Sequence, residues 1–119
     1  TSIEEWTFSR CSSLTSINIP DEVIEIDDFA FRNCSSLTSI NIPNSMTRIG
    51  SYAFAGCSGL ISITIPDNVT SIGSYAFAGC RKPKEIKYTG NQRQWDKLLA
   101  TNEDFAKWIR ENKVKVNLL

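Results

Sequence analysis

The sequence predicts an α/β repeat solenoid, in which short coils stack around one continuous core. The first observation is the even spacing of four cysteines, which stand 23 residues apart at Cys11, Cys34, Cys57 and Cys80. The second is that apolar columns recur at the same period, among them Ile17, Ile40, Ile63 and Ile86, and Phe8, Phe31, Phe54 and Phe77. Self-similarity at a fixed period of this length is the signature of stacked repeats. With 119 residues, of which 41% are hydrophobic, the chain has room for one domain and its core.

Each repeat is expected to open with a strand. In the stretch 37–43, the residues Ile40, Asn41 and Ile42 alternate between apolar and polar, as in a half-buried strand. Pro43 then ends the strand, because proline cannot donate a ladder hydrogen bond. A second, shorter extended piece follows, as at 69–72.

The rest of the repeat is expected to return the chain to the next coil. Gly50 and Gly73 are interpreted as sharp bends. The stretch 51–57 is expected to form about one and a half helical turns, with Ala53 and Phe54 facing inward. One coil cannot enclose its apolar face, whereas stacked coils can. We therefore expect about four repeats over residues 1–90, the first of them truncated, in a right-handed superhelix with a short parallel sheet.

The repeat unit resembles the BspA-like leucine-rich repeat family. Residues 37–57, which read LTSINIPNSMTRIGSYAFAGC, follow that family's pattern L-x-x-I-x-I-P-x-x-V-x-x-I-G-x-x-A-F-x-x-C. The resemblance covers residues 1 to about 88, with Asp27 in place of the glycine as one departure. It implies a leucine-rich repeat fold, an origin in a bacterial surface or secreted protein, and a role in adhesion.

The final segment, 91–119, departs from the period and is expected to cap the stack as part of the same domain. Residues 92–100 carry Trp95, Leu98 and Leu99 at helical spacing. Thr101 and Asp104 resemble a capping box that opens a second helix, and the alternating tail 114–118 predicts a final strand. A cap is favoured over the alternative that the two tryptophans form a ligand site, because the last coil of a solenoid needs a cover.

Composition argues against several classes of function. Lys plus Arg and Asp plus Glu both number 13, so a net charge of zero gives no signature for nucleic acid, and no apolar run is long enough for membrane insertion. Without histidine, the usual general base is missing. The acidic residues of one repeat could supply a catalytic pair or weak calcium ligands, but a solvated surface is favoured; they are Asp21, Glu22, Glu25, Asp27 and Asp28.

The four cysteines are interpreted as an inner column of small buried thiols. Residues in one repeat register form a line, which does not converge on a zinc ion. Their parallel side chains also give poor geometry for disulfides. We therefore predict neither a metal nor a cofactor.

Two surface ladders are candidates for binding. The first is the polar face of the strands, for which we name Thr15, Asn18, Thr38, Asn41, Thr64 and Lys87 as binding residues. Short hydroxyl and amide side chains can bond a partner at small entropic cost, although they also suit a solvated strand. The second ladder is aromatic, and half-buried stacking is favoured over a contact stripe; its members are Trp6, Phe29, Tyr52 and Tyr75.

These observations favour a non-enzymatic module that binds a protein or a glycan and acts as a monomer at the cell surface or outside the cell. The alternatives are a passive stalk that displays another domain and, from a different class, a hydrolase. Because the sequence starts inside a repeat without Met, we expect further repeats upstream.

Overall fold

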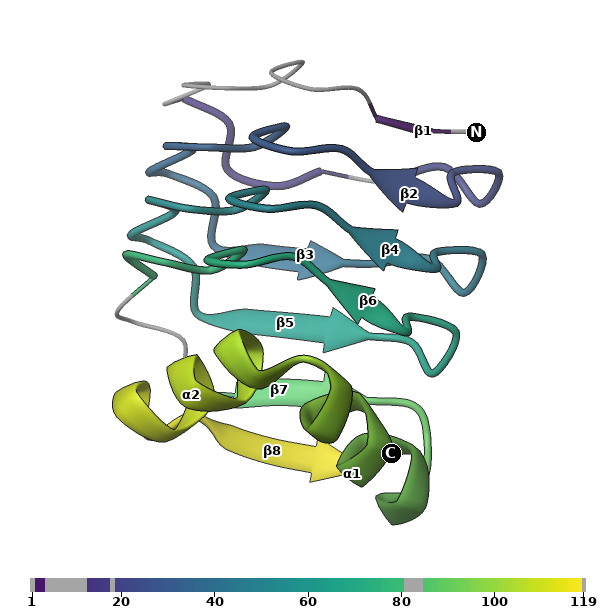
Figure 1. Cartoon of the computed structure of the whole chain (residues 1–119). Coiled ribbons are helices and arrows are strands. Elements are labelled where there is room, and N and C mark those ends of the chain that lie inside the picture. The colour runs from purple at the N-terminus through teal and green to yellow at the C-terminus, as the bar shows by residue number, and fades with distance from the viewer. Residues whose placement is uncertain (1, 4–12, 18, 81–84, 119) are drawn as a thin grey trace.

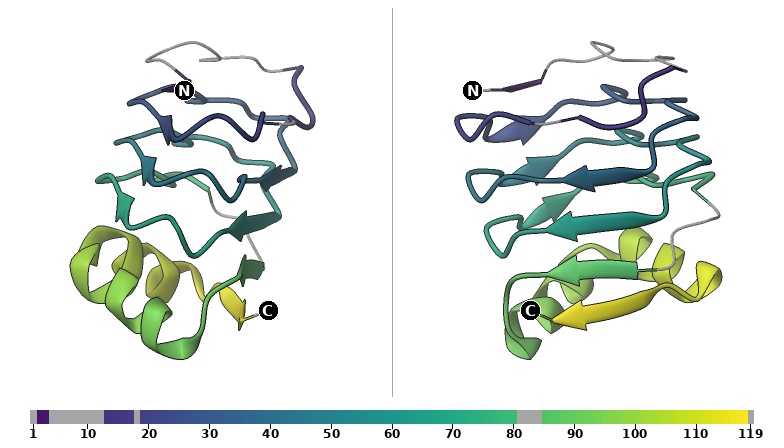
Figure 2. Two further views of the ribbon diagram at one scale, coloured as in Figure 1. Left: turned by 90° about the vertical axis from the view of Figure 1, so that its right-hand side faces the viewer. Right: turned by 180° about the vertical axis from the view of Figure 1, so that it is seen from behind.

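The computed structural model describes residues 2–3, 13–17, 19–80 and 85–118, with the side chains of residues 2–3 excepted. Figure 1 shows a stack of similar coils with two helices packed beneath the last one. Two columns of strands run along the stack, and Figure 2 shows them on different sides of each coil. The α/β solenoid predicted from the period and the leucine-rich repeat fold implied by the resemblance are therefore present, with two parallel sheets where one was predicted.

The first sheet consists of two-residue strands, one from each coil. They are β1 (Ser2–Ile3), β2 (Glu25–Ile26), β4 (Arg48–Ile49) and β6 (Ser71–Ile72), in that order and all parallel. The register pairs Ile26 with Ile49 and Ile49 with Ile72, so each residue lies beside the one 23 positions further on. The sequence period is thus the length of one coil.

The second sheet contains the strands predicted from the alternating stretch. Its strands are β3 (Ser39–Asn41), β5 (Ser62–Ile65), β7 (Glu85–Tyr88) and β8 (Lys115–Leu118), again all parallel. Ile40, Ile63 and Ile86 lie side by side in this register and are buried. The final strand β8 confirms the prediction from the tail and adds a strand that does not belong to the 23-residue repeat.

The core consists of the repeated columns lying inside the coils. Phe31, Phe54 and Phe77 stack in near-parallel pairs with ring centroids 5.2 and 5.5 Å apart. All three side chains are at most 2% exposed. Stacked rings at this separation add attraction beyond the area that they bury. The inward assignment of the phenylalanine column is confirmed for these three residues, whereas Phe8 lies outside the described residues.

The helical turns predicted for 51–57 are wrong, because this segment is a run of tight turns. Ala53 and Ala55 donate their N–H groups three residues back, to the carbonyls of Gly50 and Tyr52. The alternate N–H groups donate to the next coil, as Phe54 does to Ala76 at 2.8 Å. A helix cannot form here because every second backbone N–H group donates to the next coil and not to a carbonyl four residues back. The left-handed backbone of Tyr52, with φ 58°, also interrupts a helix.

The two glycines predicted to bend the chain lie where adjacent coils pack closely. Neither Gly50 nor Gly73 has a left-handed φ. A Cβ at Gly73 would lie 2.3 Å from the backbone nitrogen of Ser51, and one at Gly50 would lie 2.5 Å from the side chain of Asp28. Glycine therefore allows adjacent coils to approach each other at this corner.

The first helix of the cap, α1 (Gln92–Thr101), follows the prediction closely. Its N-terminus carries a capping box in which the Asn91 side chain accepts from the Gln94 backbone and the Gln94 side chain accepts from the Asn91 backbone. Trp95 and Leu98 are buried, and the Trp95 ring lies 5.0 Å from that of Tyr88. Trp95 is therefore part of the core.

The second helix, α2 (Glu103–Asn112), begins differently from the prediction. Thr101 is not its cap, because Thr101 ends α1 and donates its hydroxyl to the Lys97 carbonyl at 2.9 Å. The helix contributes Phe105 and Trp108, whose rings lie 5.8 and 5.1 Å from that of Phe77. The cap interpretation of the C-terminal tryptophans is thereby supported, since both pack against the end of the stack.

Candidate binding face

The polar face predicted from the strands forms rows that run across the second sheet. Along β3 and β5, buried isoleucines alternate with the more exposed Ser39, Asn41, Ser62 and Thr64. Asn41 pairs in register with Thr64, and Thr64 pairs with Lys87. The structure therefore brings these three predicted binding residues together in one row, at the strand spacing of about 4.8 Å.

The cap strand β8 extends these rows beyond the repeats. Asn117 lies beside Lys87, and Lys115 lies beside Glu85. Asn117 also donates its side-chain amide to the carboxylate of Glu85. Sequence reasoning missed Lys115 and Asn117 as members of the face. Their alternation predicted a strand, but their pairing with β7 does not follow the 23-residue period.

The two remaining predicted threonines lie at the edge where the chain enters the strands. Both are exposed, and Thr38 donates its hydroxyl and its backbone N–H to the carbonyl of Thr15, at 3.3 and 3.1 Å. The hydroxyl of Thr38 therefore already has a partner within the protein. Its carbonyl accepts from the N–H of Ile61, whose side chain is 46% exposed and adds an apolar member to this edge. Asn18 lies outside the described residues.

The face carries its charges at one end. Ser39, Asn41, Ser62 and Thr64 on β3 and β5 are uncharged. Glu85 and Lys87 on β7, and Lys115 on β8, are charged. A partner would thus meet short neutral hydrogen-bonding groups over the repeats and charged groups beside the cap.

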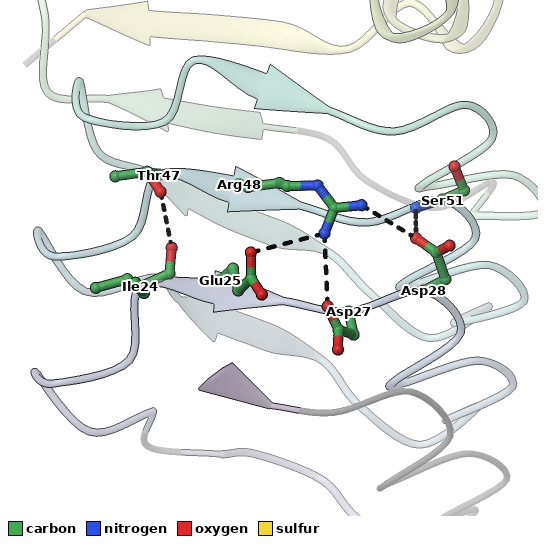
Figure 3. Close-up of polar contacts among 7 residues, drawn as sticks. All are labelled: Ile24, Glu25, Asp27, Asp28, Thr47, Arg48 and Ser51. Atoms are coloured by element: carbon green, nitrogen blue, oxygen red, sulfur yellow. Dashed lines mark hydrogen bonds and ion pairs between the residues drawn. The ribbon is translucent and has the colours of Figure 1, made fainter. Parts of the chain in front are cut away.

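Three of the five acidic residues considered for catalysis surround a single arginine in the structure. Figure 3 shows the guanidinium of Arg48 directed at Glu25, Asp27 and Asp28, which lie 3.9, 3.5 and 3.6 Å away. Asp28 also accepts the backbone N–H of Ser51 at 2.8 Å. The three carboxylates are thus engaged in holding adjacent coils together. Within the described part of the chain, no group of three or more acidic, cysteine or histidine residues is placed to hold a metal ion.

The cysteine column lies in the core, as predicted. Cys34, Cys57 and Cys80 are buried free thiols, and Cys11 lies outside the described residues. The thiols of Cys57 and Cys80 donate to the carbonyls of Phe31 and Phe54, at 3.2 and 3.1 Å. The neighbouring Cys80 thiol, together with burial, raises the pKa of the Cys57 thiol far above its ordinary value. A thiol of this kind is a poor nucleophile.

The family model described as "BspA type Leucine rich repeat region (6 copies)" matches residues 1–103. The chain belongs to this family. The match includes the coils that carry the polar rows and continues through α1. The resemblance noted from the repeat pattern is therefore confirmed, and the isoleucine and phenylalanine columns of that pattern are buried over residues 19–80 of this chain.

Solved leucine-rich repeat proteins of bacteria share the fold of this BspA-type chain. A leucine-rich repeat protein of Treponema pallidum is 28% identical, with a TM-score of 0.64 over 72% of this chain and 51% of its own. A leucine-rich cell surface protein of Faecalibacterium prausnitzii is 35% identical, with a TM-score of 0.65 over 82% of this chain and 32% of its own. A leucine-rich repeat protein of Bacteroides ovatus is 35% identical, with a TM-score of 0.52 over 72% of this chain and 34% of its own.

This BspA-type chain therefore spans between about a third and a half of the length of these solved relatives. A search of curated proteins gives no match. Among the described residues, no helix has the length and apolar character needed to cross a membrane.

The aromatic ladder of this BspA-type stack is mainly packing between coils. The rings of Phe29 and Tyr52 stack at 5.1 Å, and those of Tyr52 and Tyr75 at 5.4 Å. Phe29 and Tyr52 are half-buried, which confirms the stacking interpretation for these two. Tyr75 is 57% exposed, because the ladder ends there, and Trp6 lies outside the described residues.

Proposed function

We propose that this chain is a non-enzymatic binding module of a cell-surface or secreted bacterial protein, and that it binds a protein or a glycan across the polar face of the sheet β3–β5–β7–β8. The observation that carries the proposal is the row Asn41, Thr64, Lys87 and Asn117, in which four polar side chains lie in register on four parallel strands. Solenoids use such extended sheet surfaces to bind partners.

The chemistry of the row suits recognition. Amide and hydroxyl groups can both donate and accept, so the row matches either the peptide groups of a protein or the hydroxyls of a glycan. Asn and Thr side chains have few rotatable bonds, so fixing them on binding costs less entropy than fixing long side chains. Lys87 adds a charge that a carboxylate-bearing partner would satisfy.

Two further observations support a role in binding rather than catalysis. The BspA-type repeats supply stacked coils, and the carboxylates of Glu25, Asp27 and Asp28 are engaged by Arg48. The surface location in the proposal rests on the family and on the cell-surface protein of Faecalibacterium prausnitzii, which is similar to this chain.

The experiment is a binding screen of the purified domain against immobilised host-matrix proteins, microbial surface extracts and a glycan panel. Two variants, Asn41→Glu and Thr64→Glu, place a longer charged side chain in the row. A matched control, Ser71→Glu, places the same side chain on an exposed position of the other sheet, beside Arg48. We expect a partner that binds the parent and the control but loses at least about tenfold in affinity with either row variant.

Two outcomes would contradict the proposal. A partner that binds both row variants as tightly as the parent would place the binding surface elsewhere. Failure of every immobilised partner to bind would favour the alternative, in which these repeats are a stalk that displays another part of a longer protein. Circular dichroism of each variant shows whether a loss of binding comes from unfolding.

A further inference from the structure

The end of the repeat stack has three hydrogen-bonding edges, and the cap closes two of them. The edge of β7 pairs with β8. The edge of β6 is closed by Asn102, whose side-chain oxygen accepts the N–H of Ile72 at 2.9 Å and whose side-chain nitrogen donates to the Thr70 carbonyl at 3.2 Å. The third edge belongs to the turn segment 73–79.

In the coil before the segment 73–79, the backbone N–H groups of the equivalent turn segment have acceptors. The N–H groups of Tyr52, Phe54 and Gly56 donate across to the carbonyls of Ser74, Ala76 and Ala78, at 3.2, 2.8 and 2.7 Å. The corresponding donors one coil later are the N–H groups of Tyr75, Phe77 and Gly79. Within the described residues these three have no hydrogen-bond acceptor, although the repeat directs them toward the place of the next coil.

A cleft of about 290 Å³ lies at this open edge. The turn segment lines one side, and α2 lines the other with Asp104, Lys107, Trp108 and Glu111. In Figure 1, α2 lies beneath the last turn segment, where a further coil would continue the stack. The helix supplies rings to the core, but its backbone carbonyls are used within the helix. The indole nitrogen of Trp108 is also buried without a hydrogen-bond acceptor.

We propose that this cleft binds an extended peptide segment of a partner protein, whose backbone carbonyls accept from Tyr75, Phe77 and Gly79. Addition of a strand to an open edge is an established mode of peptide recognition. The donors come from every second residue, and every second carbonyl of an extended chain points to the same side. A single small ion could not satisfy three donors spread along this edge.

The two previous coils indicate which side chains such a peptide needs. The carbonyls that fill the same edge there belong to Ser51, Ala53 and Ala55 in one coil and to Ser74, Ala76 and Ala78 in the next. All are small residues. Phe105 and Trp108 already occupy the space against Phe77, so the intervening residues of a bound peptide must also be small.

The rim of the cleft indicates the charge of the partner. Asp104 and Glu111 carry negative charges and Lys107 a positive one, and all three side chains are exposed. The excess of one negative charge favours a peptide with basic residues beside its small-residue tract. This site is separate from the polar sheet face, so its test is independent of the function proposed above.

The experiment uses the ¹⁵N-labelled chain and a synthetic probe, acetyl-Arg-Ser-Gly-Ala-Gly-Ala-Arg-amide. Without the peptide, we expect the amide protons of Tyr75, Phe77 and Gly79 to exchange at least roughly tenfold faster than those of Tyr52, Phe54 and Gly56. Millimolar peptide should shift the three amide resonances and slow their exchange to the rate of the preceding coil.

A pair of variants on α2 tests whether the cleft is the site. Lys107→Trp fills the cleft, and we expect it to weaken peptide binding at least about tenfold. Arg110→Trp is the matched control, because Arg110 is exposed on the same helix but does not line the cleft. Protected amides at the three positions in the free chain would overturn the proposal. So would an absence of shifts with millimolar peptide, shifts confined to other residues, or equal binding by both variants. A glycan that protects these amides when the peptide does not would also overturn it.

Discussion

The backbone N–H of Ile72 donates a hydrogen bond of 2.9 Å to the side-chain oxygen of Asn102, which lies 30 residues further along the chain. The same side chain returns a hydrogen bond to the carbonyl of Thr70. One amide side chain thus presents an acceptor and a donor to the edge of β6, as a peptide group in the next coil would. An open strand edge is a template for association, and the cap removes it here without adding a strand.

Replacement of Asn102 by alanine is therefore expected to destabilise the chain. The change leaves the Ile72 N–H and the Thr70 carbonyl without their partners, and an unsatisfied group of this kind costs about 1–3 kcal/mol when water does not reach it. Urea unfolding followed by circular dichroism measures the loss. Asn102→Asp keeps the acceptor for Ile72 and should lie between the parent and Asn102→Ala. An unchanged midpoint for Asn102→Ala would show that water replaces both hydrogen bonds.

A larger effect is expected in the middle of the phenylalanine column. Phe54 is fully buried and stacks on both neighbouring rings, so Phe54→Ala removes contacts and leaves a cavity between coils. We expect a loss of about 3–5 kcal/mol in the free energy of unfolding. Tyr75→Ala is the control, since Tyr75 is more than half exposed and stacks on one side only. Comparable losses for the two variants would contradict the difference in burial.

The sequence period was sufficient to predict most of the fold. A fixed period requires equivalent residues of successive repeats to lie side by side, so the register of Ile40 with Ile63 and Ile86 follows directly. The turn segment could not be predicted in the same way. Residues 51–57 include the helix-favouring Ala53 and Ala55. The alternate N–H groups of the segment, however, donate to carbonyls 22 residues away, which no local pattern indicates.

The candidate binding face was predictable only as far as the period extends. Asn41, Thr64 and Lys87 fall in one row because they occupy one column of the repeat. Asn117 joins that row at a separation of 30 residues from Lys87, which depends on how the two cap helices return the chain. The closure of the edge by Asn102 has the same origin. Contacts made by the cap depend on tertiary packing, and the repeat pattern carries no information about them.

Substitution of Arg48 tests how far the charged cluster stabilises the stack. Its side chain is 42% exposed, and exposed ion pairs contribute less than about 1 kcal/mol each. Because Glu25, Asp27 and Asp28 would be left to repel one another, we expect Arg48→Ala to lower the thermal midpoint at low ionic strength and much less at 1 M salt, where charges are screened. Thr47→Ala, which loses an exposed hydroxyl bond to the Ile24 carbonyl beside the cluster, is the neutral control. An effect of Arg48→Ala that does not depend on salt would assign it to lost packing.

The buried thiol of Cys57 predicts a loss of stability at alkaline pH. Its pKa in the folded chain is raised above its ordinary value of 9.0 by the neighbouring Cys80 thiol and by burial. The neutral thiol is therefore favoured in the folded state. Its contribution to stability is complete below pH 9 and is lost as the pH rises above 9, because the unfolded chain then releases a proton that the folded chain retains. We expect the free energy of unfolding to fall between pH 8 and pH 10.

The measurement is urea unfolding at several pH values for the parent chain and for Cys57→Ala. The variant should be less stable at pH 7.5, because it loses a packed side chain, but its stability should decline less steeply with pH. Tyr88 also titrates at a raised pKa, owing to burial and to the charge of Asp67, so a smaller decline is expected to persist in the variant. Labelling by a thiol reagent gives a second reading, since the native chain should react at Cys57 only as fast as it opens. Parallel pH profiles for parent and variant, together with rapid native labelling, would show that the thiol is accessible and ionises normally.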